Sequence, residues 1–126
     1  MKEYAFVKTI KFSEEDLIDL IDAAIEGGIG YWCCIGNDTK EWDEVETEYP
    51  KACIDELMYH ILEKGESIVL IDKESDETHH LTMDKFLKGI QMAIDCNVWD
   101  GDTYNADAIV GDCIFQYALF GKLIYG

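Results

Sequence analysis

The sequence contains no arginine: all ten basic residues are lysines, against 27 aspartates and glutamates. The formal net charge is therefore −17. Arginine forms bidentate hydrogen bonds with phosphates and with guanine edges. Neutralisation of phosphates by basic side chains supplies most of the non-specific affinity of proteins for nucleic acid. A chain of this charge repels nucleic acid at long range and attracts basic protein surfaces. We therefore expect no direct nucleic-acid contact.

A long apolar run is also missing. No stretch approaches the roughly 20 apolar residues that a membrane helix requires. The opening MKEYAFVKTIKF is too short and too charged for a signal peptide. The five cysteines are odd in number and show no CxxC spacing, which is typical of reduced, mostly buried thiols. We expect a cytoplasmic protein with no membrane contact.

The common motifs of catalysis and cofactor binding are absent as well. The sequence has no Gly-rich phosphate loop, no GxSxG elbow, no HExxH and no dinucleotide fingerprint. Gly27, Gly28 and Gly30 follow a predicted helix instead of preceding one, so they indicate a helix stop and a tight turn. His79 and His80 are adjacent in a predicted strand and point to opposite faces. We expect a non-enzymatic protein without a cofactor or catalytic residues.

What is present suffices for one folded domain over residues 1–126. Of these residues 48% are hydrophobic and 12% aromatic, enough to bury a core without metals or disulfides. Helical and strand patterns mix without βαβ regularity, which favours an α+β fold. We predict about four helices packed on a small, mostly antiparallel sheet.

In the first half, residues 4–12 have the aromatic and β-branched content of a strand. Ser13 is a predicted N-cap for a helix running to about Glu26. Residues 29–35 are short and apolar, as in a buried strand. Residues 40–49 (KEWDEVETEY) are compatible with an edge strand or a loop, and the pattern does not decide between them.

In the second half, Pro50, the only proline, is predicted to begin a helix that Gly65 closes. Residues 67–72 and 78–81 flank a polar tip and predict a β-hairpin. Thr82 and Asn105 are predicted to cap two further helices, the last ending at Gly121. Residues 123–125 are compatible with a final strand.

The carboxylates of the first helix recur at intervals of four, three and four residues, on the face opposite its apolar side chains. A second group lies in residues 40–49. Such an array can imitate a run of phosphates and occupy a basic groove, or it can be a solvated face that keeps the protein soluble. The candidate partner-binding residues are Glu15, Asp19, Asp22, Glu26, Asp43, Glu44, Glu46 and Glu48.

The loop over residues 95–107 offers a competing interpretation, because it is rich in aspartate and asparagine oxygens, which Ca²⁺ and Mg²⁺ prefer. The EF-hand register fails, however: counting from Asp95, the fifth position is Trp99 and the glycine comes one place late. Asx turns explain the same residues. The alternative function here is metal binding at residues 95–107, and no residue is assigned as a metal ligand.

Aromatic residues support another alternative, a small-ligand-binding or sequestering oligomer, which ranks ahead of metal binding. The turn over residues 27–32 and the segment 114–125 would form its pocket, with Lys85, Lys88 or Lys122 receiving an anionic ligand. Residues 114–125 (IFQYALFGKLIY) are nearly all apolar. Either they pass through the centre of the fold, or they form a homodimer contact.

Three segments carry a family resemblance: EGGIGYWC at residues 26–33, LTMDKFLKGI at residues 81–90, and residues 106–126, which end in YALFGKLIYG. The chain resembles small acidic proteins of unassigned function encoded in prophages and integrative elements of Firmicutes. The resemblance implies a setting, since small acidic proteins of mobile elements include inhibitors of host defence that act as DNA mimics. Our leading hypothesis is therefore a non-enzymatic binding protein that docks on a basic, nucleic-acid-handling host protein.

Overall fold

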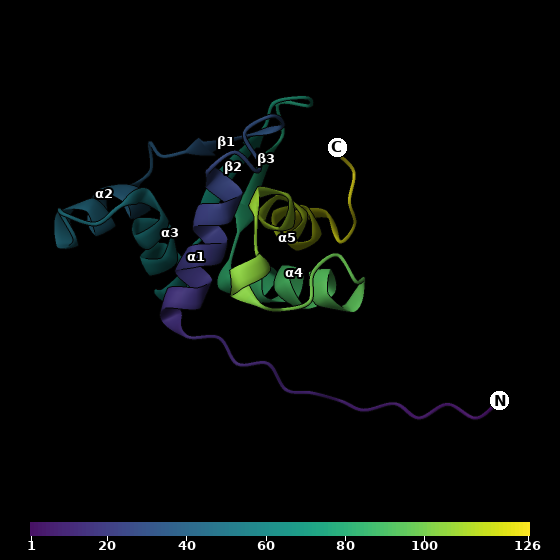
Figure 1. Cartoon of the computed structure of the whole chain (residues 1–126). Coiled ribbons are helices and arrows are strands. Elements are labelled where there is room, and N and C mark those ends of the chain that lie inside the picture. The colour runs from purple at the N-terminus through teal and green to yellow at the C-terminus, as the bar shows by residue number, and fades with distance from the viewer.

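A computed structural model describes all 126 residues and shows an α+β fold of five α-helices on a three-stranded sheet (Figure 1). The helices and strands follow one another as α1 (Glu14–Ile25), β1 (Cys33–Gly36), α2 (Lys40–Glu48), α3 (Ile54–Glu63), β2 (Ile68–Asp72), β3 (Thr78–Leu81), α4 (Met83–Asp95) and α5 (Ala108–Phe120). A short 3-10 helix, η1 (Thr103–Asn105), precedes α5. The predicted fold class is confirmed, with five helices in place of about four.

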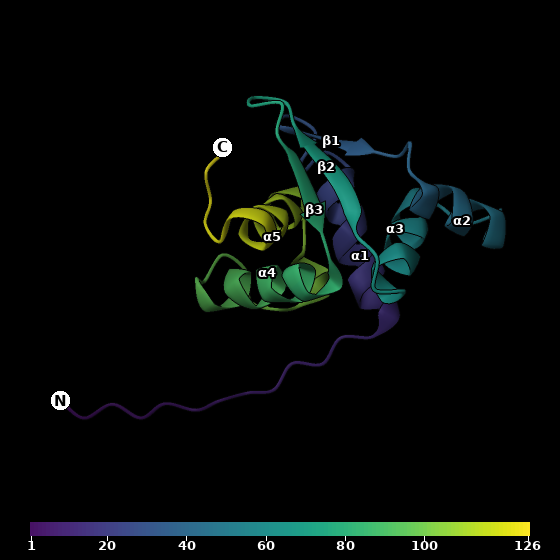
Figure 2. The ribbon, with the colours of Figure 1, turned by 180° about the vertical axis from the view of Figure 1, so that it is seen from behind.

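The sheet is antiparallel throughout, in the order β1-β2-β3. Along β2 the side chains alternate, with Ile68, Leu70 and Asp72 buried and the residues between them half-buried. Helices α1 and α5 lie on the same side of the sheet, and α2 lies at the edge of the molecule beyond α3 (Figure 2). From behind, β2 and β3 stand in front of α1 and α5 (Figure 2). The predicted β2–β3 hairpin is confirmed, and it fixes which side chains of β2 enter the core.

Helix α5 passes through the centre of the molecule, between α4, α1 and β3. Its residues from Cys113 to Ala118 are all buried. Close approach to the neighbouring helices requires glycine at two contacts. A methyl group on Gly111 would overlap the backbone of Ala23 and Ala24 in α1, and one on Gly89 of α4 would overlap the backbone of α5. The sequence left two alternatives for the apolar segment 114–125, burial in the core or a homodimer contact. Residues 114–118 are buried in the core.

Local capping signals correctly placed several helix ends. Ser13 accepts a hydrogen bond from the Asp16 backbone N–H (3.1 Å), and the Asp16 carboxylate accepts one from the Ser13 N–H (2.8 Å), which completes a capping box. Thr82 is the N-cap of α4, and its hydroxyl accepts a hydrogen bond from the Lys85 N–H at 3.3 Å. Gly27, Gly65 and Gly121 have φ of +86°, +81° and +71°, so each ends a helix in a conformation that disfavours side chains.

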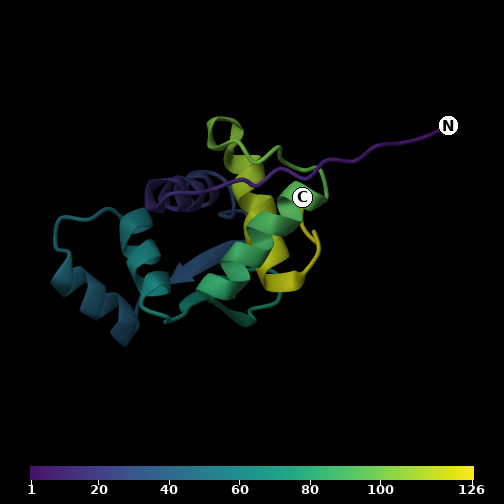
Figure 3. The same ribbon diagram turned by 90° about the horizontal axis from the view of Figure 1, so that it is seen from below.

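The predicted strand over residues 4–12 is wrong. These residues form an extended N-terminal arm that pairs with no strand and leads away from the body of the molecule (Figures 1 and 3). Only its last residues touch the body: Phe12 stacks on Trp99 with 5.8 Å between ring centroids. Strand propensity alone does not create a strand, because the arm reaches no sheet edge of its own chain.

Residues 40–49 are neither strand nor loop, because residues 40–48 form helix α2. Thr39 is the N-cap, and its hydroxyl accepts a hydrogen bond from the Trp42 N–H at 3.4 Å. Trp42 and Val45 lie three residues apart and are both buried, as expected for a helix with one packed face. The third apolar residue of this pattern, Tyr49, lies just beyond the last turn.

Two neighbouring predictions are also corrected. Pro50 does not begin a helix. It is the second residue of a turn that the Ala52 N–H to Tyr49 C=O hydrogen bond closes at 3.1 Å, and α3 begins only after Cys53. Of the predicted strand 29–35, only residues from Cys33 onward pair with β2, because the preceding residues form a turn in which the Cys33 N–H bonds the Ile29 carbonyl.

Two further corrections lie near the C-terminus. Asn105 does not cap α5. Asp107 does, accepting a hydrogen bond from the Val110 N–H at 2.9 Å. Residues 123–125 form no strand, because the Ile124 and Tyr125 N–H groups donate to the side-chain oxygen of Gln116 (2.8 and 2.9 Å) instead of a sheet edge. None of the helices combines the length and the apolar composition that a membrane crossing needs.

Candidate protein-binding surface

Helix α1 presents four of the candidate carboxylates on one exposed face. Glu15, Asp19, Asp22 and Glu26 are all exposed, whereas Leu20, Ile21 and Ala24 on the opposite face are buried. The Ser13 capping box fixes the start of the helix and thereby the direction of this face. The spacing read from the sequence therefore becomes a continuous line of negative charge along the helix.

Helix α3 adds two carboxylates that the sequence interpretation missed. Asp55 and Glu56 lie in its first turn and, with Glu14, Glu15 and Asp19 of α1, line a groove of about 800 Å³. Ser13 and Ile18 complete the lining of this α1–α3 groove. Two adjacent acidic residues before the apolar stripe of α3 were a detectable signal of a helix N-terminus, but their position beside α1 depends on tertiary packing.

Electrostatic crowding in this region is visible at Asp22. Desolvation raises the pKa of its carboxyl above the usual 3.8, and the negative charges of Asp55, Glu26 and Asp19 raise it further. The contribution of Asp55 comes from a different helix, so the carboxylates of α1 and α3 act on each other. A cationic partner would relieve this mutual repulsion.

Helix α2 carries the other four candidates, Asp43, Glu44, Glu46 and Glu48, and all four are exposed. Two of them have a lysine neighbour within their own chain: Glu44 lies 3.6 Å from Lys40, and Glu48 pairs with Lys64. The hydrogen bond from Lys64 lowers the pKa of the Glu48 carboxyl. This half of the predicted set is therefore partly neutralised, and α3 separates it from α1 (Figure 1).

The negative charge is unevenly distributed over the chain. Residues 13–66, which run from the α1 cap past α3, contain 16 carboxylates and three lysines, whereas residues 67–126 contain ten carboxylates and four lysines. In Figures 1 and 2, α1, α3 and α2 form one side of the molecule and α4 and α5 the other. We define the acidic helix surface as eleven carboxylates of the first three helices, nine of them exposed and two, Asp55 and Glu56, half-buried: Glu14, Glu15, Asp19, Asp22, Glu26, Asp43, Glu44, Glu46, Glu48, Asp55 and Glu56.

The loop over residues 95–107 uses its oxygens for local hydrogen bonds. Asp100 accepts bonds from the Asp102 N–H (2.9 Å) and the Asn105 side chain (2.8 Å), and Asp102 accepts one from the Tyr104 N–H. The bonds from Asp102 and Asn105 lower the pKa of Asp100. The carboxylates act as Asx caps of successive turns, and nothing in this geometry favours the metal-binding alternative.

The one group of side chains with ligand atoms close enough for a metal lies elsewhere, at the start of α3. The ligand atoms of Cys53, Asp55 and Glu56 lie within 4.8 Å of one another. Cys53 is exposed, and the charge of Glu56 is the main cause that raises the pKa of its thiol, so the thiolate is disfavoured as a ligand. We treat these residues as part of the acidic helix surface.

The histidines serve packing and short polar contacts. The ring of His60 stacks on Tyr49 with centroids 3.9 Å apart, and its Nδ1 lies 3.6 Å from the Glu63 carboxylate. His79 faces inward against Phe120, while His80 faces outward and contacts the Ser67 hydroxyl at 3.3 Å. The opposite orientation of the two adjacent histidines agrees with the sequence prediction.

A polar cluster that the sequence interpretation missed holds the C-terminal segment. The Asp112 carboxylate accepts hydrogen bonds from Tyr31 (2.7 Å), from the Trp32 indole (2.7 Å) and from Gln116 (3.0 Å). Burial is the main cause that raises the pKa of Tyr31 to about 12, with the Asp112 hydrogen bond second. Two of the segments that carry the family resemblance, residues 26–33 and 106–126, therefore meet through these side chains.

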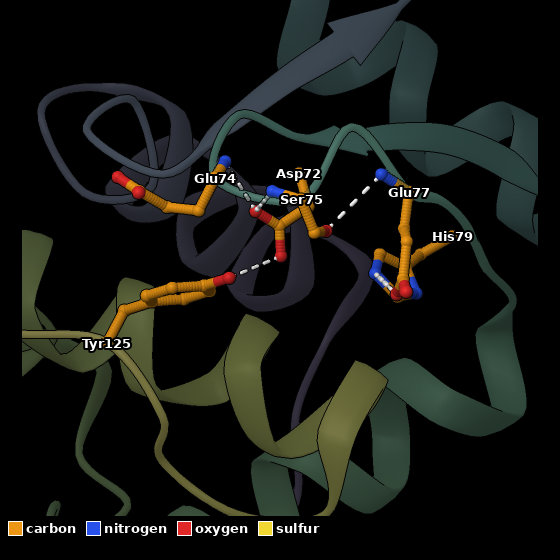
Figure 4. Close-up of polar contacts among 6 residues, drawn as sticks. All are labelled: Asp72, Glu74, Ser75, Glu77, His79 and Tyr125. Carbon is orange, nitrogen blue, oxygen red and sulfur yellow. Dashed lines mark hydrogen bonds and ion pairs between the residues drawn. The ribbon is translucent and has the colours of Figure 1, made fainter.

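Asp72 anchors the end of the chain from the sheet side. Its carboxylate accepts hydrogen bonds from the Tyr125 hydroxyl (2.5 Å) and from the backbone N–H groups of Glu74 and Ser75 (2.8 and 3.3 Å), as Figure 4 shows. Burial by itself would raise the pKa of Asp72, but these donors outweigh it and lower the pKa. The same bond raises the pKa of Tyr125 to about 12.

The aromatic residues proposed for a ligand pocket pack on one another. Trp32 stacks on Tyr125 with centroids 5.3 Å apart and contacts Phe120 at 5.5 Å. Of the three lysines considered for an anionic ligand, Lys85 instead donates to the His80 carbonyl at 2.9 Å. This side of the molecule is filled by its own side chains, so the ligand-binding alternative gains no support from it.

No protein-family model matches the chain, and no curated protein or solved structure does. The resemblance to acidic proteins of mobile elements therefore stays a prediction. The function has to be argued from the surface itself. Its most distinctive property is the acidic helix surface and the α1–α3 groove within it.

Proposed function

We propose that the protein is a non-enzymatic binding protein whose acidic helix surface docks on a basic, nucleic-acid-handling protein in place of that protein's nucleic acid. The observation that carries the proposal is the concentration of exposed carboxylates between Ser13 and Glu66, at a density well above that of the rest of the chain. A positively charged cleft is the surface that such an array complements.

The support is strongest for the α1–α3 part of this surface. Its carboxylates come from two helices held against each other by a buried core, so their spacing is fixed before a partner arrives. No lysine lines the α1–α3 groove. In contrast, Lys40 and Lys64 already occupy part of the α2 surface. We therefore place the centre of the contact at Glu15, Asp19, Asp22, Asp55 and Glu56.

In this proposal the protein is encoded by a phage or mobile element and acts in the cytoplasm of a host cell, against a host-defence protein. The support for that setting is the resemblance of the three segments described above. Binding would be steered at long range and would weaken steeply with salt, because a contact between exposed charges is screened over about 10 Å at 0.1 M ionic strength.

The test begins with a pull-down from a Firmicute lysate at low and high salt, followed by calorimetry with the purified partner. We expect Asp19→Lys with Asp22→Lys to weaken binding at least about tenfold, a loss of about 1.4 kcal/mol. The matched control is Glu74→Lys with Glu77→Lys, which makes the same charge change at the β2–β3 hairpin tip. Equal affinities of the two double variants would remove the α1 face from the proposal.

A further inference from the structure

The N-terminal arm, residues 1–12, lacks backbone hydrogen bonds and exposes apolar side chains. None of its residues belongs to a helix or strand or takes part in a backbone hydrogen bond. Three of its large apolar side chains are largely exposed, with Tyr4 at 79%, Phe6 at 93% and Val7 at 99%. Exposed apolar side chains grouped on one segment indicate a surface that binds something.

The charge of the arm is opposite to that of the body. The arm contains three lysines (Lys2, Lys8 and Lys11) and one glutamate, while the remaining residues contain 26 carboxylates and seven lysines. A segment that combines ammonium groups with apolar side chains fits a surface that combines carboxylates with apolar contacts. The chain carries such a surface in the α1–α3 groove, where Ile18 lies among the carboxylates and α3 begins with the 56% exposed Ile54.

The arm is directed away from the groove of its own chain. Phe12 stacks on Trp99, and Ile10 lies against Gly101, on the side of the molecule formed by α4 and the loop that follows it. Figures 1 and 3 show the arm running from α1 past α4 and beyond the body. Folding back into its own groove would break the Phe12–Trp99 contact. The arm of a second copy can enter the groove while its own Phe12–Trp99 contact is kept, and it gives up only the contact of Ile10 with Gly101.

We propose that two copies of the chain exchange arms, so that residues 2–11 of each copy bind in the α1–α3 groove of the other. The arm joins α1 at Ser13, and Ser13 also lines the groove. A two-fold axis near Ser13 would therefore bring each arm beside the other copy's groove. Ten extended residues span at most about 35 Å, which is enough to cross the neighbouring copy.

In this arrangement Lys8 and Lys11 contact the groove carboxylates, and Tyr4 and Phe6 cover Ile18 and the exposed part of Ile54. The arm thus acts as a basic ligand supplied by the protein itself. The inference goes beyond the proposed function and does not rest on it, since it concerns the purified protein alone. If both hold, arm exchange competes with partner binding for the same groove.

Sedimentation velocity of the full-length protein at low salt tests the proposal. We expect a concentration-dependent dimer that dissociates when salt is raised. Lys8→Glu with Lys11→Glu should raise the dimer dissociation constant at least about tenfold. The matched control, Lys88→Glu with Lys122→Glu, makes the same change of net charge at lysines outside the arm and should leave the constant within about twofold. Both arm positions are exposed, so neither substitution disturbs the core.

A charge-swap experiment distinguishes arm exchange from any other dimer. A groove variant with Glu14→Lys, Glu15→Lys and Asp19→Lys has a basic arm and a groove of net positive charge, because three lysines then face Asp55 and Glu56. The arm variant has an acidic arm and an acidic groove. Each alone should be monomeric, and an equimolar mixture should form a heterodimer in which both contacts join opposite charges. A chain that stays monomeric up to millimolar concentration, or a mixture that does not associate, would overturn the proposal.

Discussion

Gln116 shows how a single polar side chain can hold a terminal segment. It is 1% exposed; its oxygen accepts the Ile124 and Tyr125 N–H groups, and its nitrogen donates to Asp112. No hydrophobic residue could replace these bonds, although the neighbouring positions of α5 are apolar. In the sequence, this glutamine is a polar residue within an apolar helix. In the fold, its oxygen accepts the two backbone N–H groups that would otherwise need a neighbouring strand.

We predict that Gln116→Leu lowers the free energy of unfolding by about 1–3 kcal/mol, because two N–H groups of the terminal segment lose their acceptor. Urea unfolding followed by tryptophan fluorescence measures the change, since Trp32 stacks on Tyr125. Gln91→Leu is the control: Gln91 is exposed and bonds only Asp95, so the substitution should change stability by less than about 0.5 kcal/mol. Equal effects would mean that Gln116 has no special role.

A second prediction at this scale concerns the pH dependence of the Tyr125–Asp72 bond. The pKa of Tyr125 is raised from 10.0 to about 12 in the folded protein, so the unfolded chain releases this proton first as pH rises. The stability that the bond provides is fully present below pH 10 and is lost as pH approaches 12. We expect Tyr125→Phe to be less stable than the unmodified protein at neutral pH, with a difference that shrinks above pH 10. Urea unfolding at several pH values measures it, and a difference that grows with pH would contradict the prediction.

At the scale of the helices, small residues decide how closely α1, α4 and α5 can approach. Gly111 and Gly89 have no room for a side chain, since each faces the backbone of a neighbouring helix. Helix propensity alone would favour alanine at both positions by roughly 1 kcal/mol. The packing of three helices around α5 therefore opposes the local preference of the sequence, and packing prevails.

We predict that Gly111→Ala destabilises the protein by about 1–3 kcal/mol, because the added methyl group pushes α1 and α5 apart. The control is Gly30→Ala, where nothing lies within 4 Å of the added carbon. The control should change the free energy of unfolding by less than about 0.5 kcal/mol. Thermal or urea unfolding compares the two. A stabilised Gly111→Ala variant would show that the helices can separate without loss.

Helix α2 has a helical spacing of apolar residues within a highly charged segment. Its three apolar residues, Trp42, Val45 and Tyr49, are separated by three and four residues, which is a helical period. The high charge of the surrounding residues obscured this short pattern. The helix packs mainly against α3. The spacing of the apolar residues thus predicts that this segment is a helix, but it does not predict that the helix lies at the edge of the molecule.

For the whole molecule, the excess of carboxylates is a cost to stability. With a net charge of −17, the folded chain brings like charges closer together than the unfolded chain does. Desolvation is the main cause that raises the pKa of Asp22, and repulsion from Asp55, Glu26 and Asp19 raises it further. A surface that carries only negative charge therefore lowers the stability of the free protein. A cationic partner or a basic arm would reduce this electrostatic repulsion.

We predict that the melting temperature rises when NaCl is raised from low to moderate concentration, because salt screens repulsion between exposed charges separated by more than about 10 Å. A variant with Glu15→Gln, Asp19→Asn, Asp22→Asn and Glu26→Gln should melt at a higher temperature in low salt and respond less to NaCl. Differential scanning calorimetry measures both proteins. A melting temperature that falls with salt would indicate that attractive ion pairs outweigh the repulsion.

Features that depend on neighbouring residues are already encoded in local sequence patterns. Ser13 and Thr82 as caps, Gly65 and Gly121 as helix ends, and the β2–β3 hairpin follow from contacts within a few positions along the chain. The spacing of the α1 carboxylates likewise fixed a charged helix face without reference to the rest of the fold.

Features that depend on distant segments arise only when the chain folds. It left the strand-like residues 4–12 without a sheet edge, turned Gln116 into the partner of the last residues, and brought Asp55 of α3 beside the carboxylates of α1. Each outcome depends on which surfaces meet when the helices pack on the sheet. Local patterns cannot encode this, because burial and pairing are properties of the assembled core.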